Sequence, residues 1–310
     1  MAKNEKQAEN SLFSGILCIN KPSGFTSHDV VNKLRRLYNT KKVGHTGTLD
    51  PMATGVLIVL IGGAVKASEY LMSQKKAYLA GLRLGLTSDT EDISGTILTR
   101  CKDLPKKEEV FAVCKDFVGD IMQIPPMYSA LKVGGKKLVD IARSGESIER
   151  EARPISVYRL DCECINEESG DYLLSVECSK GTYIRTLCAD IGAKLGCGGL
   201  MFSLKRRENC GFSIEESHTL EEIEALDISE RGNLLVPIEK AFCDYTRLDL
   251  APFYATLAKN GVKLFASKVA KDAQIGEKFA LYDSGSFFAV AEAIQNAEGE
   301  TLIRVMKQFK

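Results

Sequence analysis

The chain has 310 residues, of which 45% are hydrophobic and 26% charged, and its 41 Lys and Arg balance 41 Asp and Glu. This composition is typical of a globular protein with a sizeable core, in one large domain or two modest ones, and it excludes a disordered chain. No run of residues approaches the ~18 consecutive apolar positions of a membrane span, so we expect no membrane association.

The first part of the chain predicts strands and helices in irregular alternation. Residues 1–10 are polar and match neither a signal peptide nor a transit sequence, so we expect a cytoplasmic protein. Ser27 is the expected N-cap of a helix whose apolar face runs to Leu37. The other elements expected here are strands at 14–20, 56–62 (fully buried) and 76–85, a polar loop at 88–95 and a helix at 108–118.

The second part of the chain favours hairpins. Residues 123–153 are rich in Pro, Gly and charge, and they are followed by a predicted hairpin made of a strand from Val157, the turn EESGD and the strand YLLSVECS. A helix then ends at Gly196 or Gly198. Because hairpins outnumber regular βαβ units, the pattern favours an α+β fold over a doubly wound sheet. One helix and short strands beyond Asp249 predict a small separate domain.

The zero net charge conceals an uneven distribution. Residues 11–76 carry nine Lys and Arg against three Asp and Glu, a net of +6, whereas residues 154–247 carry ten against seventeen, a net of −7. Much of the acid lies in 215–230, where TLEEIEAL predicts a capped surface helix. Tight basic groups fit phosphate contacts, although exposed lysines on any protein form some of them. These groups are Arg35–Arg36, Lys41–Lys42, Lys75–Lys76, Lys132 with Lys136–Lys137, and Lys205–Arg206–Arg207.

The chain lacks the patterns of metal and cofactor sites. Its ten cysteines form no CxxC pair, which excludes the usual zinc spacings, and they are expected to be reduced and to pack as small hydrophobic residues. Only three histidines are present, and GHTGT and VGGKK lack the full spacing of a phosphate loop. We therefore expect neither a metal nor a cofactor.

The most distinctive segment is the glycine-rich loop GHTGTLDPMATG at residues 44–55. Its glycines allow close approach of the backbone or positive φ angles, and Pro51 stiffens the turn after Asp50. The loop therefore presents one carboxylate in a defined position. An ordinary Asp-Pro turn is the alternative that the dipeptide alone favours.

Five separated motifs resemble the TruB family of tRNA pseudouridine synthases, in the family's order and across residues 14–247. The segment from GILCINKPSGFTSHDVVNKLRRLY to KKVGHTGTLDPMATGVLIVLIGGAVK is followed by KAYLAGLRLGLTSDTEDISG, IPPMYSALKVGGKKLVDIAR, CSKGTYIRTLCADIGAKLGC and SLKRRENCGFSIEES. Together these motifs resemble the bacterial branch of the family, whose members act without a guide RNA.

The resemblance implies an enzyme that converts uridine 55 of the tRNA T-loop to pseudouridine without a metal or cofactor. It places the catalytic carboxylate at Asp50, its cation partner at Arg185 and the aromatic residue that stacks on the target base at Tyr78. Asp50 must be ionised to attack the base or sugar or to take a proton from C2′, and these routes stay open. Burial under a flipped base would raise the pKa of Asp50, so a cation partner is physically needed.

The resemblance also implies which other residues bind the RNA. His45 matches a residue that enters the T-loop, Asp92 an acid that contacts the RNA or orders the site, and Tyr183 and Leu204 pocket-lining positions. Residues 123–153 correspond to an inserted thumb that closes over the T-arm. The remaining candidates for RNA binding are Lys132, Lys136 and Lys137 of the thumb, Arg206, and Lys21, whose motif with Pro22 points to a structural role.

The fold that follows from the resemblance is a mixed, mainly antiparallel catalytic sheet with flanking helices in residues 1–247 and a PUA-like, β-rich domain in residues 248–310. We expect a monomer that binds the tRNA T-arm and no guide RNA. A non-catalytic module that binds or folds the tRNA elbow is the alternative function, although such a module has no need of a buried ion pair. A guide-dependent relative is disfavoured by the short C-terminal domain and by the absence of a basic tail.

Overall fold

The computed structural model of the chain describes residues 13–72 and 75–309. The polar N-terminal segment 1–10, from which we expect no targeting sequence, lies outside these residues. None of the helices within the described ranges is long and apolar enough to cross a membrane. All ten cysteines are free thiols.

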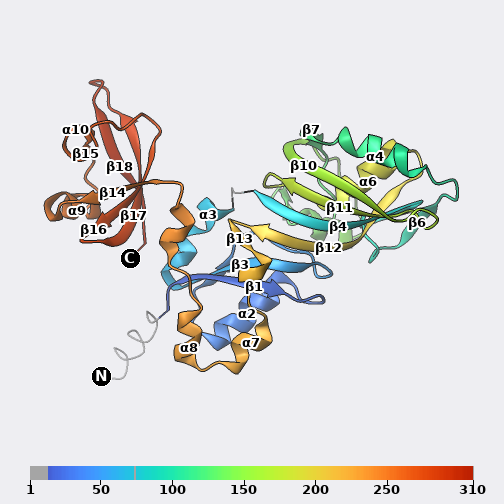
Figure 1. Cartoon of the computed structure of the whole chain (residues 1–310), viewed down its shortest axis with the longest axis horizontal. Coiled ribbons are helices and arrows are strands. Elements are labelled where there is room, and N and C mark those ends of the chain that lie inside the picture. Colours follow the sequence, from blue (N-terminus) through green and yellow to red (C-terminus); the bar gives the residue numbers. More distant parts are fainter. Residues whose placement is uncertain (1–12, 73–74, 310) are drawn as a thin grey trace.

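A large sheet forms the centre of the molecule, with its long strands in the order β1-β3-β12-β4-β11-β10-β7 (Figure 1). Strand β2 pairs with β3 and strand β13 with β12. Neighbouring strands are antiparallel except β3 and β12, which are parallel. This arrangement confirms the predicted α+β fold. The strands are β1 Gly15–Lys21, β2 Val43–His45, β3 Thr54–Ile61, β4 Lys76–Leu84, β7 Gly119–Gln123, β10 Arg153–Asn166, β11 Asp171–Cys178, β12 Gly199–Asn209 and β13 Phe212–Ser213.

Strand β3 is buried on both faces, as its unbroken apolar sequence predicts. Successive side chains point to opposite faces of a strand, so Ile58 packs in one hydrophobic cluster and its neighbours Leu57 and Val59 pack in another. At the start of β3, Gly55 has a φ of 100°, and an added Cβ would lie 2.2 Å from the carbonyl oxygen of Arg206. Only glycine allows β3 and β12 to approach this closely.

The helices cover the sheet and form largely where the sequence predicts them. Helix α2 is capped by Thr26, which accepts a hydrogen bond from the Asp29 N–H, so the predicted cap at Ser27 is wrong by one residue. Ser27 is buried instead, with its hydroxyl bonded to Leu49. The helices and 3₁₀ turns of this part are α2 Ser27–Leu37, η2 Gly62–Ala67, α3 Ser68–Leu71, α4 Lys107–Lys115, α6 Ile184–Lys194, η3 Ile214–Glu216, α7 Leu220–Ala225, α8 Ile228–Asn233 and η4 Ile238–Phe242.

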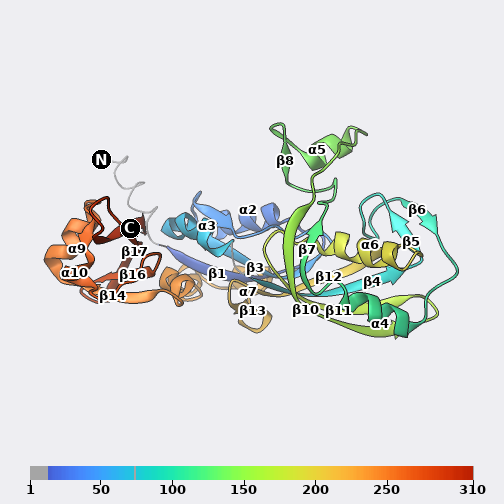
Figure 2. The same ribbon diagram turned by 90° about the horizontal axis from the view of Figure 1, so that it is seen from above.

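Two small hairpins lie outside the large sheet. Strands β5 (Leu86–Ser88) and β6 (Ile97–Arg100) flank the predicted polar loop. Strands β8 (Lys132–Val133) and β9 (Lys136–Lys137) lead into α5 (Leu138–Arg143), and this unit projects away from the sheet (Figure 2). The projecting unit lies within the segment that we predict to be a thumb.

The C-terminal part of the chain forms a second, five-stranded sheet in the order β14-β16-β17-β18-β15. Its first strand begins at Thr246, two residues before the boundary that we predict from the sequence. The elements are β14 Thr246–Leu250, α9 Pro252–Lys259, β15 Leu264–Phe265, α10 Ala266–Val269, β16 Lys278–Asp283, β17 Ser286–Gln295 and β18 Thr301–Gln308. The expected β-rich C-terminal domain is thus confirmed.

Aromatic side chains join the two sheets. Phe242 of η4 is buried, and its ring lies 5.7 Å from that of Phe287 and 5.2 Å from that of Phe309. On the other side, the ring of Tyr70 lies 5.5 Å from Phe242. We call these four residues the aromatic junction. It places the small domain in direct contact with the edge of the large one.

Candidate active site

The loop at residues 46–53 connects β2 to β3 and carries Asp50. The Ser27 hydroxyl accepts a hydrogen bond from the Leu49 N–H at 2.9 Å. The Asp50 carbonyl accepts a bond from the Ala53 N–H at 3.0 Å, which closes a turn over Pro51. These bonds fix the backbone on both sides of Asp50.

Lys21 also holds the loop that carries Asp50, through a hydrogen bond to its main chain. Its side chain is fully buried, and Nζ donates to the carbonyl oxygens of Pro22, Phe25 and Pro51 at 2.9, 2.7 and 3.3 Å. Burial lowers the pKa of this ammonium to about 8. A side chain enclosed in this way fits the structural role implied for the Lys21–Pro22 motif better than a contact with RNA.

Arg206 is also enclosed, so it is not the surface cation that the run Lys205–Arg206–Arg207 suggests, although it lines the cavity that contains Asp50. The side chain is fully buried and donates from Nε to the Val56 carbonyl at 2.7 Å and from its terminal nitrogens to the carbonyls of Gly47 at 3.1 Å and Thr48 at 3.5 Å. The reason is strand alternation: Lys205 and Arg207 point outward from β12, so the residue between them points inward. Arg206 therefore holds the Asp50 loop against the sheet.

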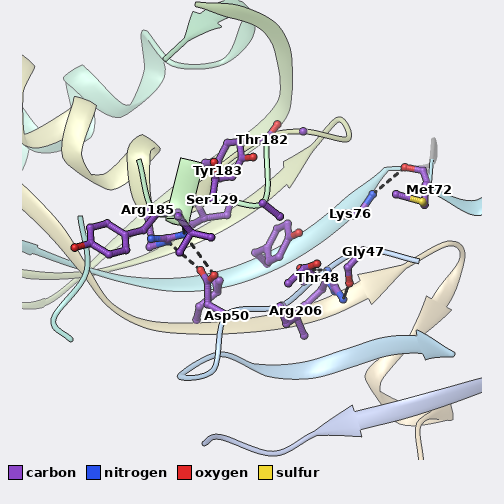
Figure 3. Close-up of a pocket in the computed structure, with 18 residues that line it drawn as sticks. Gly47, Thr48, Asp50, Met72, Lys76, Ser129, Thr182, Tyr183, Arg185 and Arg206 are labelled. Carbon is purple, nitrogen blue, oxygen red and sulfur yellow. Dashed lines mark hydrogen bonds and ion pairs between the residues drawn. The ribbon is translucent and has the colours of Figure 1, made fainter. Parts of the chain in front are cut away.

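Asp50 forms a two-point ion pair with Arg185, the second residue of α6. Nε of Arg185 lies 3.0 Å from Oδ2, and a terminal nitrogen lies 3.4 Å from Oδ1. The Asp50 side chain is 33% exposed, whereas that of Arg185 is 7% exposed. The cation thus forms the buried base of the pair, and the carboxylate faces the cavity (Figure 3).

Three further oxygens fix the guanidinium of Arg185. It donates to the carbonyls of Thr90 and Tyr128 at 3.0 and 2.8 Å, and it lies 3.8 Å from the carboxylate of Asp92. Asp92 is itself buried and accepts hydrogen bonds from the Thr90 hydroxyl and the Ser94 N–H. Asp92 is therefore placed to order Arg185, which is one of the two roles implied by the resemblance.

Opposing influences act on the ionisation of Asp50. Burial raises the pKa of this carboxyl, the positive charge of Arg185 lowers it, and the negative charge of Asp92 raises it again; the balance lies above the usual value. Asp50 nevertheless keeps a permanent cation at hydrogen-bonding distance. The arrangement can supply a carboxylate that is ionised but poorly solvated, which makes it a strong base or nucleophile.

A cavity of about 400 Å³ opens above this ion pair. Tyr78 of β4 and Leu204 of β12 line it, and both are largely buried. Tyr183, the residue before α6, closes it from the opposite side, and its main chain is held by two hydrogen bonds to the side chain of Gln123. Largely apolar walls, with the Asp50–Arg185 pair and the cations Lys76 and Arg206 among the lining residues, suit a flat, mostly apolar ring such as a nucleobase that is attached to a charged backbone.

Comparison with known proteins places this cavity in a family. Residues 35–184 match the model described as the TruB family pseudouridylate synthase N-terminal domain, and residues 185–242 match the tRNA pseudouridylate synthase B C-terminal domain. The tRNA pseudouridine synthase B of Clostridium tetani is 40% identical over 94% of this chain and 99% of its own. That of Clostridium kluyveri is 43% identical over 88% and 93%. The chain belongs to the TruB family.

Solved structures share the fold. A chain in a Cbf5–Nop10–Gar1 complex is 25% identical, covers 96% of this chain and 86% of its own length, and superposes with a TM-score of 0.73. A chain in an H/ACA RNP bound to a substrate RNA containing 2′-deoxyuridine is 22% identical, with coverage of 98% and 87% and a TM-score of 0.71. In both cases the structural similarity covers the large sheet and the C-terminal domain.

Some of the site residues that the resemblance to the TruB family predicts lie away from the cavity. His45 of β2 is half-buried and does not line it; burial and the nearby Arg206 lower the pKa of its imidazole, which favours the neutral form. Lys132, Lys136 and Lys137 are exposed on the projecting hairpin. The structure thus leaves the thumb lysines apart and brings together these predicted site residues: Asp50, Arg185, Asp92, Tyr78, Tyr183, Leu204 and Arg206.

Sequence reasoning missed several supporting groups. Ser27 positions the loop that carries Asp50, Gln123 positions Tyr183, and the carbonyl of Tyr128 positions Arg185. Lys76 lines the cavity. The first three of these act on, or through, main-chain atoms, which leave no pattern in a sequence. Lys76 was named from the sequence only as part of a basic group that fits phosphate contacts. Its place on the cavity wall had a signal too, because it lies two residues before Tyr78 on a predicted strand and so shares its face.

Proposed function

We propose that this chain is a tRNA pseudouridine synthase that isomerises uridine 55 in the T-loop of tRNA. The observation that carries the proposal is the pairing of Asp50 with the buried Arg185 at the base of an apolar cavity. The names of the relatives that match along nearly the whole chain support it. The fold alone does not determine an activity.

The reaction needs only groups that the chain itself supplies. The bond between ribose C1′ and uracil N1 breaks, the base turns within the cavity, and a new bond joins C1′ to C5. The hydrogen on C5 leaves as a proton, and N1 gains a proton, so atoms and electrons balance without an oxidant or a second substrate. Asp50 initiates this exchange, and the fixed guanidinium of Arg185 keeps it ionised in a poorly solvated site.

The RNA must present the uridine outside its stack, because the cavity accepts a single base. Extruding a base costs a few kcal/mol. Tyr78 stacks on the extruded uracil, Tyr183 and Leu204 enclose it, and His45 enters the T-loop near the vacated place. Asp92 holds the guanidinium of Arg185 in position. The exposed lysines of the thumb, Lys132, Lys136 and Lys137, bind phosphates of the T-arm.

We further propose that the chain acts directly on tRNA as a monomer in the cytoplasm, without a guide RNA. Relatives named for a tRNA activity are 40–43% identical to it, whereas the chain of the H/ACA RNP is 22% identical. This difference supports recognition of the tRNA itself. The division into a catalytic domain of residues 1–247 and an RNA-binding domain of residues 248–310 is part of the same proposal.

The experiment that tests the function is tritium release from tRNA transcripts labelled at uridine C5. We expect release by the wild type and a rate at least about 10²- to 10⁴-fold lower for Asp50→Asn, as for the loss of an acid–base or nucleophilic group. The matched control is Asp116→Asn, because Asp116 is an exposed carboxylate at the C-terminal end of α4 and does not line the cavity. Equal release by wild type and Asp50→Asn would refute the catalytic assignment.

Two further measurements separate catalysis from binding. A transcript in which uridine 55 is replaced should release no tritium from its remaining uridines; continued release would place the reaction elsewhere. Asp50→Asn should still bind the unmodified transcript. A wild type that binds tRNA tightly but releases no tritium would instead support a non-catalytic module that binds or folds the tRNA elbow.

A further inference from the structure

Lys76 is a largely buried cation on the wall of the candidate active site. Its side chain is 8% exposed, although it stands at the first position of β4. Lys76 and Tyr78 are separated by one residue, so their side chains project from the same face of the strand. The lysine therefore reaches the cavity beside the aromatic ring on which we place the target base.

Two cavities meet at this lysine. The cavity of about 400 Å³ that contains Asp50 and a second one of about 860 Å³ are both lined by Lys76 and Met72. The second cavity is also lined by two more cations, Arg153 and Lys180, and by the carboxylates of Glu69 and Glu151. Figure 3 shows Lys76 beside Met72, apart from the ion pair of Asp50 and Arg185. Lys76 thus lies where the two cavities adjoin.

The surroundings of Lys76 favour an anionic ligand. Its Nζ donates to the Met72 carbonyl at 3.5 Å, and Lys180 and Arg206 add positive charge nearby. Burial and these charges lower the pKa of the ammonium. An anion bound beside Lys76 would be attracted by all three of these cations.

The chemistry of an extruded nucleotide identifies the anion. Uracil and ribose are neutral, so the only negative charges that accompany them are the phosphodiesters on either side. With the glycosidic bond at Asp50 and the base over Tyr78, a flanking phosphate has to lie outside the part of the cavity that holds the base. The ammonium of Lys76, on the cavity wall beside Tyr78, matches a phosphate oxygen in charge and in hydrogen bonding.

From these observations we infer that Lys76 binds one of the two phosphodiesters flanking the extruded uridine and thereby holds its ribose against Asp50. The inference rests on the proposed function, which supplies the nucleotide. It makes Lys76 a substrate-binding residue in addition to the thumb lysines. Its neighbour Lys75 has no such role, because that side chain is 59% exposed and lies near Glu177.

The test couples a change in the protein to a change in the RNA. T-arm stem-loops are prepared with an uncharged methylphosphonate at either linkage beside the target uridine, and kcat/KM for tritium release is measured with full-length protein. For the wild type, one of the two linkages should reduce kcat/KM by about 10- to 100-fold, the range for a hydrogen bond between charged groups. On the unmodified RNA, kcat/KM for Lys76→Met should be lower than for the wild type by a similar factor. The methylphosphonate at the sensitive linkage should then reduce kcat/KM of this variant little further.

Lys75→Met is the matched control and should respond to the methylphosphonates like the wild type. If the wild type tolerates both methylphosphonates, the inference is overturned without reference to any variant. It is equally overturned if Lys76→Met, or Lys76→Gln should the first variant not fold, still loses the full factor at the sensitive linkage. Failure of the wild type to release tritium from the unmodified stem-loop would instead refute the proposed function.

Discussion

At the scale of single residues, the ionisation of Asp50 depends on a balance between burial, which raises its pKa, and the charge of Arg185, which lowers it. Burial and Asp92 raise the pKa of the Asp50 carboxyl, and Arg185 lowers it. If ionised Asp50 is the active form, activity is lost as the pH falls through this pKa. Replacing Arg185 by Gln removes the lowering influence, so the acid limb of the profile should move to higher pH, together with a lower maximal rate.

The measurement is kcat/KM for tritium release as a function of pH for the wild type, Arg185→Gln and Arg185→Lys. The lysine variant keeps a positive charge and should show the smaller displacement of the acid limb. An acid limb that is the same for the wild type and Arg185→Gln would contradict the view that Arg185 controls the ionisation of Asp50.

Arg206 makes a different contribution, to the stability of the loop that carries Asp50. Replacement by Met leaves three main-chain acceptors, on Gly47, Thr48 and Val56, without their donor. A buried acceptor without a partner costs about 1–3 kcal/mol. We expect the free energy of unfolding to fall by about 3–5 kcal/mol, measured by urea denaturation.

Arg207→Met is the control for Arg206→Met, because Arg207 is exposed on the same strand. It should change the free energy of unfolding by less than about 0.5 kcal/mol, as is usual for surface positions. Similar losses for the two variants would show that Arg206 does not anchor the loop.

The sequence anticipated the central residues of the site better than their supports. Asp50, Arg185 and Tyr78 could be predicted because motifs tie them to a family, and the structure places them together. Arg206 was predicted as a surface cation because a run of three basic residues suggests an exposed patch. Its burial follows from the alternation of β12, which becomes apparent only once the strand's register is known.

At the scale of elements, the thumb hairpin presents like charges side by side. Lys132 lies directly opposite Lys137, joined by a turn in which Gly134 and Gly135 both have positive φ. Like charges in facing positions destabilise a hairpin, and phosphates between them would relieve the repulsion. The hairpin is therefore suited to bind RNA at the expense of its own stability.

We expect replacement of Lys132, Lys136 and Lys137 by Gln to weaken binding of the T-arm without lowering the Tm. Each lost phosphate contact should reduce the slope of log K against log salt by about 0.7 to 0.9. The slope is measured by titration of a labelled stem-loop at several salt concentrations. The control replaces three exposed lysines in and just before α4, Lys102, Lys107 and Lys115, to which we assign no RNA contact. An unchanged slope for the thumb variant would contradict phosphate binding by the hairpin.

Helices and long strands could be predicted from periodicity, whereas the sheet order could not. Strand β3 has the apolar run of a buried strand, and α4 begins and ends near its predicted limits. The parallel pairing of β3 with β12 joins Thr54 to Lys205, two segments far apart in the sequence. No local pattern contains that pairing, which depends on how all the intervening elements pack.

At the scale of the whole molecule, the aromatic junction couples the two sheets. Phe242 is 2% exposed and touches residues of both parts. Truncating a buried Phe to Ala costs about 3–5 kcal/mol. We expect Phe242→Ala to lower the Tm and to separate the unfolding of the small domain from that of the large one, so that calorimetry resolves two transitions in place of one.

Phe253→Ala is the control for the junction, because Phe253 is 67% exposed on α9. It should leave the thermal transition unchanged. A single transition for Phe242→Ala, at the Tm of the wild type, would show that the aromatic contacts do not hold the domains together.

The anchoring of the Asp50 loop also bears on which partner adapts during recognition. Main-chain oxygens of Gly47, Thr48 and Pro51 are bound by the buried cations Arg206 and Lys21. Moving the loop would break these interior bonds, so the protein offers a rigid surface and the nucleic acid must be remodelled to fit it. Turnover should then depend on the intrinsic plasticity of the tRNA elbow, and a transcript whose elbow opens easily should react faster once bound than a tightly folded one.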